Sequence, residues 1–123
     1  MTNTAKVAIN LATGLEDGER VTVALLVGVA AAERHKQVTM FLTKEAVRLA
    51  VPGYAQGTAC EGCPPIPLLL EQFAAGGGAL LVCPICFNAR KLDAGVLAAN
   101  ARLGGATPLW DWIGDDDATV FSY

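Results

Sequence analysis

Four cysteines, arranged as two Cys-x-x-Cys pairs, are the residues of this sequence best equipped for chemistry. Cys60 and Cys63 form the first pair, and Cys83 and Cys86 form the second. Cysteine pairs at this spacing either exchange electrons between dithiol and disulfide or bind a metal ion. The spacing therefore predicts reactive thiols, and it leaves zinc bound by all four cysteines as the alternative.

The second pair stands where a strand is expected to end and a helix to begin. Apolar residues 79–82 predict the strand, and residues 87–92 predict the helix. A cysteine at such a junction faces unpaired backbone N–H groups and the positive end of the helix dipole, which favour thiolate over thiol. Arg90, in the same helix, adds positive potential. We therefore expect Cys83 and Cys86 to be the reactive residues.

A length argument places the first pair beside the second. A predicted helix at 66–75 leads away from Cys60 and Cys63, and the strand at 79–82 leads back to Cys83. The helix with its turn covers about 18 Å and the returning strand about 16 Å. Both pairs are therefore expected at the carboxyl end of the strands, with Cα separations of about 10 Å or less.

Strand-like and helix-like segments alternate along the chain. Strands are predicted at 6–11, 38–42, 79–82 and 119–122, with a weaker candidate at 96–99. Helices are predicted at 19–36, at 44–50 after a Thr43 cap, at 66–75, at 87–92, and at 109–113 after Thr107-Pro108. This order predicts a single domain over residues 1–123, a three-layer α/β/α sandwich with a mostly parallel sheet of about five strands.

Composition narrows the function classes. Hydrophobic residues make up 53% of the 123 residues and charged residues 17%, which favours a homo-oligomer that hides apolar surface, with helix residues 21–32 contributing contacts. A net charge of −3 with scattered basic residues argues against nucleic acid as a partner. The longest apolar run, 21–32, is shorter than the ~20 residues of a membrane span. With no signal peptide in the sequence, we expect a cytoplasmic protein.

Several segments resemble the DsrE/DsrF-like (YchN-like) family of sulfur-relay proteins. They are residues 13–17, residues 38–47, the run 82–90 with its cysteines and arginine, and the final strand with Val120 and Phe121. The resemblance covers nearly the whole chain and implies a small parallel α/β sandwich that forms trimers or hexamers. It also implies that Cys83 or Cys86 carries a persulfide between a sulfur-donor and a sulfur-acceptor protein.

Two features depart from the pattern of the sulfur-relay subunits. Those subunits use a single reactive cysteine, whereas this chain has the pair Cys83 and Cys86, and it has Cys60 and Cys63 in addition. A persulfide beside a second thiol resolves to a disulfide and releases sulfide. We therefore expect persulfide transfer or thiol redox chemistry without a cofactor, with Cys60 and Cys63 as resolving thiols and Arg90 in support. The alternative is a non-catalytic oligomeric module that binds structural zinc.

Overall fold

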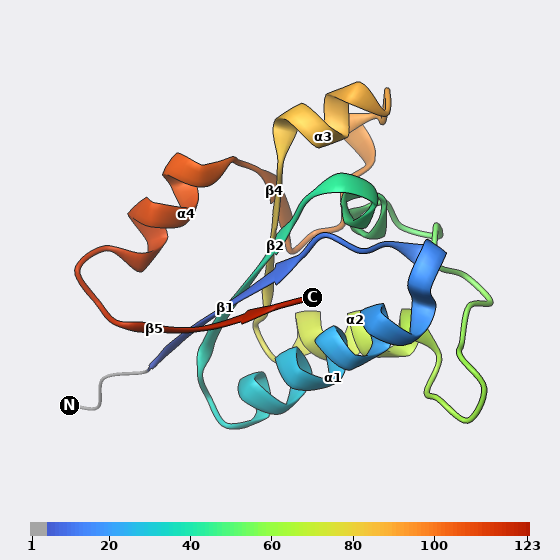
Figure 1. The fold of residues 1–123 in the computed structure, drawn as a ribbon, viewed down its shortest axis with the longest axis horizontal. Helices are drawn as coiled ribbons and strands as arrows, with labels where there is room; N and C mark the ends of the chain where they lie inside the picture. The colour runs from blue at the N-terminus through green and yellow to red at the C-terminus, as the bar shows by residue number, and fades with distance from the viewer. Residues whose placement is uncertain (1–4) are drawn as a thin grey trace.

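The computed structural model describes residues 5–123 as a five-stranded sheet with helices on both sides (Figure 1). The strand order is β4-β3-β2-β1-β5, and every neighbouring pair is parallel. The strands are β1 Lys6–Leu11, β2 Gln37–Leu42, β3 Ala79–Val82, β4 Ala101–Leu103 and β5 Ala118–Ser122. The predicted α/β sandwich with a sheet of about five strands is confirmed, and the sheet is parallel throughout.

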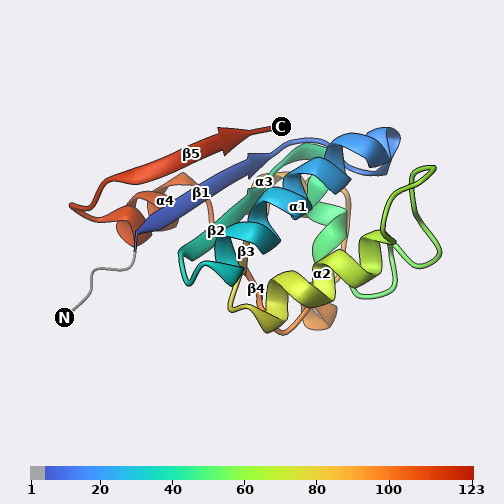
Figure 2. The same ribbon diagram turned by 90° about the horizontal axis from the view of Figure 1, so that it is seen from below.

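The helices divide between the two sides of the sheet. Figures 1 and 2 show α1 (Gly18–Glu33) and α2 (Ile66–Ala75) side by side on one face. On the other side lies α4 (Ala106–Ile113), while α3 (Pro84–Ala89) stands beyond the carboxyl end of β3. Short 3₁₀ helices add η1 (Leu15–Asp17), η2 (Lys44–Ala50) and η3 (Ala94–Val96). Among residues 5–123, no helix is both long and apolar enough to cross a membrane.

Phe73 of α2 locks the α1–α2 layer onto the sheet. Its ring is fully buried and lies against two glycines, Gly28 of α1 and Gly78 just before β3. A Cβ atom at Gly28 would come within 3.0 Å of the Phe73 ring, and one at Gly78 within 2.4 Å. This close approach, which needs glycine, fixes α2 beside α1 and sets where the preceding loop lies.

Several element boundaries differ from those predicted. The helix predicted at 19–36 ends at Glu33, because Arg34 and His35 turn the chain with backbone bonds to Ala31 and Ala32 and His35 has φ 61°. Residues 44–50 form a 3₁₀ helix instead of an α-helix. The helix predicted at 87–92 is α3 at 84–89, and α4 begins at Ala106 instead of after Thr107.

The weak strand predicted at 96–99 is wrong. β4 lies at Ala101–Leu103, paired with β3. Residues 94–96 form η3, and the Ala98 N–H donates to the Ala50 carbonyl at 2.8 Å instead of to the sheet. The apolar run therefore packs beside η2, and the short edge strand follows it.

Candidate functional site

Cys83 and Cys86 lie at the carboxyl end of β3, as predicted. The Cys83 N–H donates to the Leu42 carbonyl at 3.0 Å, which extends the β2–β3 ladder by one residue, and the Cys83 carbonyl accepts from the Phe87 N–H at 3.0 Å in the first turn of α3. Both cysteines are free thiols of intermediate exposure that pack against the core. The strand therefore ends at one thiol, and the helix carries the other within its first turn.

The predicted contact between the thiols and backbone N–H groups is not found for Cys83. This residue occupies the N-cap position of α3, and within residues 5–123 its sulfur caps no N–H group of that helix. Pro84 follows at the first helical position, where it has no N–H to offer. The case for a reactive Cys83 thiol therefore depends on its position at the end of β3 and on its partial exposure, not on contacts with backbone N–H groups.

Arg90 ties α3 to η2 through Glu45. The Arg90 Nη1 donates to the Cys86 carbonyl at 3.1 Å, and its Nε donates to the Glu45 carboxylate. Arg48 donates to the same carboxylate at 2.9 Å. The two guanidinium groups, Arg90 first and Arg48 second, lower the pKa of Glu45. Arg90 thus lies next to the site, where it contacts the backbone of Cys86 and a carboxylate of η2.

This ion-pair cluster predicts a loss of stability in acid. Because the pKa of Glu45 is lowered in the folded chain, the charged carboxylate stabilises the fold above its ordinary value of 4.5, and the stabilisation is lost as the pH falls through the lowered pKa. Glu45→Gln should therefore unfold at lower urea concentration than the native chain at neutral pH. In strong acid the two chains should become equally stable. A difference that persists unchanged in acid would contradict this assignment.

Arg48 provides a matched control for Arg90, because both side chains bind Glu45 but Arg90 alone of the two is bonded to Cys86. Arg90→Gln should change the rate at which iodoacetamide alkylates Cys86 in the folded chain. Arg48→Gln should leave that rate close to the native one. Equal effects of the two substitutions would mean that the link to the Cys86 carbonyl does not position the thiol.

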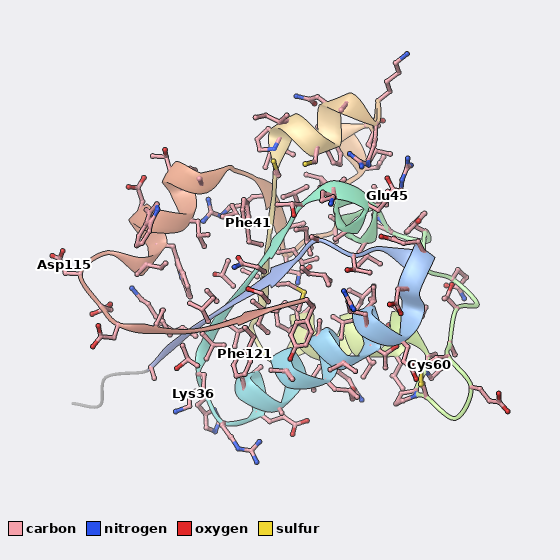
Figure 3. All side chains as sticks on the ribbon, viewed as in Figure 1. Lys36, Phe41, Glu45, Cys60, Asp115 and Phe121 are labelled. Atoms are coloured by element: carbon pink, nitrogen blue, oxygen red, sulfur yellow. A yellow bond between two sulfur atoms is a disulfide. The ribbon has the colours of Figure 1, made fainter. Side chains whose placement is uncertain are left out.

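Cys60 and Cys63 do not join this site. They form a disulfide with each other, with a Cα–Cα distance of 5.1 Å. Cys60 Sγ lies 3.6 Å from the hydroxyl of Thr22 in α1, and Figure 3 shows Cys60 in a loop beside α1 and α2, well away from α3. The prediction that the first pair lies beside the second is therefore not confirmed (Figure 3), and the role of Cys60 and Cys63 as resolving thiols for Cys83 and Cys86 stays a prediction. The first pair sits near the start of α1.

The four-cysteine zinc site is also wrong. Within residues 5–123, no three His, Cys, Asp or Glu side chains lie close enough together to hold a metal ion. Zinc in a structural site needs four such ligands in a tetrahedron. Neither cysteine pair is therefore completed by the other within the described part of the chain.

Glu45 is the site residue that the sequence reasoning missed. It lies 45 positions before Arg90, so no local motif connects the two residues. A signal was present, since Glu45 follows closely on β2, the neighbour of β3 in the sheet. The carboxyl ends of parallel neighbours meet at one edge, where a charged residue is a candidate partner for Arg90.

A cavity of about 830 Å³ lies between the loop after η2, α2 and residues 98–100. Its lining is mainly apolar, and Gln56, Glu71 and Asn100 supply polar groups. None of the four cysteines lines this cavity. The thiol site at β3 is instead open at the surface, where Ile85 between the two cysteines is 81% exposed.

Solved structures of other proteins share the fold of this chain. The crystal structure of the ychN protein from E. coli superposes with a TM-score of 0.78 at 20% identity, covering 98% of this chain and 100% of that one. Two proteins of unknown function follow, MTH1491 from Methanobacterium thermoautotrophicum and BT1422 from Bacteroides thetaiotaomicron. Their TM-scores are 0.63 and 0.62 and their identities 10% and 16%, with 94% and 96% of this chain and 98% and 94% of theirs covered.

A search of curated proteins finds no match to the sequence. The solved structures are below a quarter identical to this chain, so they establish the fold alone. The model of the DsrE/DsrF-like family matches residues 5–121, almost the full length. The chain is therefore a member of the DsrE/DsrF-like family.

Proposed function

We propose that this protein handles sulfur through Cys83 and Cys86, either by carrying a persulfide or by thiol–disulfide exchange. The observation that carries the proposal is the pair of free, partly exposed thiols at the carboxyl end of β3, within one turn of each other. Open α/β sheets bind their ligands at this edge. Membership of a family generally associated with sulfur relay or redox chemistry supports the same conclusion.

The proposed chemistry needs only the two thiols and an external sulfur donor. A thiolate of the pair attacks the outer sulfur of a donor persulfide, so that a cysteine persulfide forms and the donor leaves as a thiolate. The outer sulfur then passes to an acceptor thiolate. Alternatively the second thiol of the pair attacks the sulfur bound to carbon, which forms a Cys83–Cys86 disulfide and releases sulfide. The second outcome oxidises the pair by two electrons and reduces the transferred sulfur.

Intact mass spectrometry tests this proposal. Anaerobically purified chain, incubated with inorganic polysulfide, is expected to gain the mass of one or more sulfur atoms, which dithiothreitol removes. Peptide mapping should place the added sulfur, or a new disulfide, on Cys83 or Cys86. Iodoacetamide should label these two residues while Cys60 and Cys63 stay paired. A chain that gains no sulfur and forms no Cys83–Cys86 disulfide would overturn the proposal.

We also propose a protein partner at the site and a cytoplasmic location. An isoleucine side chain that is 81% exposed between two thiols suits contact with a sulfur-donor or sulfur-acceptor protein, since exposed apolar groups at a site mark interaction surfaces. Free thiols such as Cys83 and Cys86 persist in the reducing cytoplasm.

Assembly into a trimer or hexamer is part of the same proposal. Val23 and Leu26 on α1 are 43% and 44% exposed, and Val120 and Phe121 on β5 are 55% and 38% exposed. Apolar surface of this kind favours burial between subunits. Sedimentation velocity at micromolar concentration should show a trimer or hexamer, and Leu26→Glu should shift it toward smaller species. A native monomer would contradict the proposal.

A further inference from the structure

The Cys60–Cys63 disulfide lies in an accessible loop, apart from the thiols at β3. Its neighbours Glu61, Gly62, Pro64 and Pro65 are all exposed. In Figure 3 the loop projects from the molecule beside the starts of α1 and α2. A thiol in solution can therefore reach this disulfide without any opening of the core.

The disulfide is poorly placed to brace the fold. It encloses two residues, and the entropy that a crosslink removes from the unfolded chain is smallest for short loops. The loop also has anchors of its own. Ala55 and Ile66 are buried near its two ends, and the Ile66 N–H donates to the Thr58 carbonyl at 2.9 Å. The position of the loop therefore does not depend on the S–S bond.

The backbone holds the two cysteines together independently of that bond. The Cys63 N–H donates to the Cys60 carbonyl at 2.9 Å, and Gly62 adopts φ 77°, a conformation that glycine enters without strain. These features involve main-chain atoms only, so they persist when the sulfurs separate. A reduced pair would remain positioned to close again.

The two sulfurs have different surroundings. Cys63 Sγ lies 3.7 Å from the exposed Glu61 carbonyl. Cys60 Sγ lies 3.6 Å from the Thr22 hydroxyl, whose residue is 2% exposed and which donates to the Gly18 carbonyl at 2.7 Å. A hydroxyl rotates freely about its C–O bond. Its proton can therefore turn from Gly18 to a thiolate that forms on Cys60.

From this geometry we propose that Cys60 and Cys63 form a second redox site, which exchanges two electrons with an external dithiol. A thiolate of the dithiol attacks Cys63 Sγ, the S–S bond breaks, and Cys60 leaves as a thiolate beside Thr22. The second thiolate of the dithiol then attacks its own sulfur in the mixed disulfide and releases Cys63 as a thiolate. The external dithiol becomes a disulfide, and the two new thiolates take protons from water. This site acts separately from Cys83 and Cys86.

Reversibility is the first test, in a Cys83→Ser, Cys86→Ser chain whose remaining cysteines are Cys60 and Cys63. Dithiothreitol should reduce the disulfide in the folded chain, and oxidised dithiothreitol should restore it, as measured by alkylation and intact mass. The circular dichroism spectrum should stay the same in both states. Reduction that requires a denaturant, or that unfolds the chain, would show a structural disulfide and overturn the proposal.

Thr22 supplies the second test. Thr22→Val keeps the shape of the side chain but removes the hydroxyl, so reduction should slow by about tenfold, the effect of losing one hydrogen bond to a charged group. Thr22→Ser should retain the native rate. Thr39→Val is the matched control, since Thr39 is likewise buried, at 3% exposure, but lies on β2. Equal slowing in Thr22→Val and Thr39→Val, or none in either, would remove Thr22 from the mechanism.

The attacked sulfur can be identified directly. Brief reaction of the folded chain with glutathione, followed by acid quenching, should trap the mixed disulfide on Cys63 more than on Cys60. Trapping mainly on Cys60 would show that Cys60 is attacked and Cys63 is the leaving thiolate, which would contradict the proposed mechanism. Sulfur uptake by Cys83 and Cys86 is measured in a Cys60→Ser, Cys63→Ser chain. A failure of the proposed function is therefore distinguished from a failure of the proposed second redox site.

Discussion

Replacing both thiols at β3, Cys83→Ser with Cys86→Ser, is expected to abolish the uptake of sulfur from polysulfide. Serine keeps the size of each side chain, but its hydroxyl cannot hold a persulfide. The loss should be complete within detection, because no other free thiol is present among residues 5–123. Intact mass spectrometry of the incubated chain measures the result, and unfolding in urea checks that the variant is folded.

The matched control is Cys60→Ser with Cys63→Ser, which also removes two cysteines. This chain should take up as much sulfur as the native one, since Cys60 and Cys63 are bonded to each other in a loop away from α3 (Figure 3). The single substitutions separate the two proposed reactions. A chain with one thiol left at β3 can hold a persulfide but cannot resolve it internally, so it should release less sulfide than the native chain. Uptake that survives the double substitution at β3 would refute the proposed function.

Phe87→Ala is expected to lower the free energy of unfolding by about 3–5 kcal/mol, as for other buried phenylalanines. Phe87 is fully buried and directly follows Cys86, so its ring fastens the first turn of α3 to the core. The substitution should also speed alkylation of Cys86 in the folded chain, because α3 loses its anchor. Urea unfolding and timed iodoacetamide labelling measure the two effects.

Phe73→Ala separates these effects. Phe73 is also fully buried, but it lies in α2 and packs against Gly28 and Gly78, so its loss should reduce stability by a similar amount without changing the labelling of Cys86. If Phe87→Ala is too unstable to study, Phe87→Leu should give the same pattern at smaller amplitude. Faster labelling in both alanine variants would point to general loosening, and would contradict a specific role of Phe87 at the site.

The elements that could be predicted were those with clear boundaries in the sequence. The helix at Ile66–Ala75 and the strand at Ala79–Val82 lie where they were predicted, because prolines precede the helix and three glycines separate it from an apolar strand. β4 could not be located in the same way. It has three residues, one of them Arg102, and it owes its pairing to β3, which is a tertiary contact and leaves no periodic pattern.

The positions of the two cysteine pairs were predicted along the direction of the strands, but not across the sheet. Comparing the lengths of α2 and β3 fixes how far the chain travels parallel to the strands. It put both pairs toward the carboxyl edge, where Cys83 ends β3 and Cys60 lies near the start of α1. Lengths carry no information about where a loop lies across the sheet. That was decided by the packing of Phe73 against Gly28 and Gly78, and this contact could not be read from the sequence.

The exposure of Ile85 bears on which sulfur donors the site would prefer. A partner that encloses this side chain removes it from water, which favours binding by about 1.5–3 kcal/mol and corresponds to roughly a ten- to hundredfold gain in affinity. Inorganic polysulfide and other small sulfane-sulfur donors have no surface with which to cover it. Under the proposed function, a side chain that takes no part in the chemistry would thus let the protein discriminate macromolecular donors from diffusible ones.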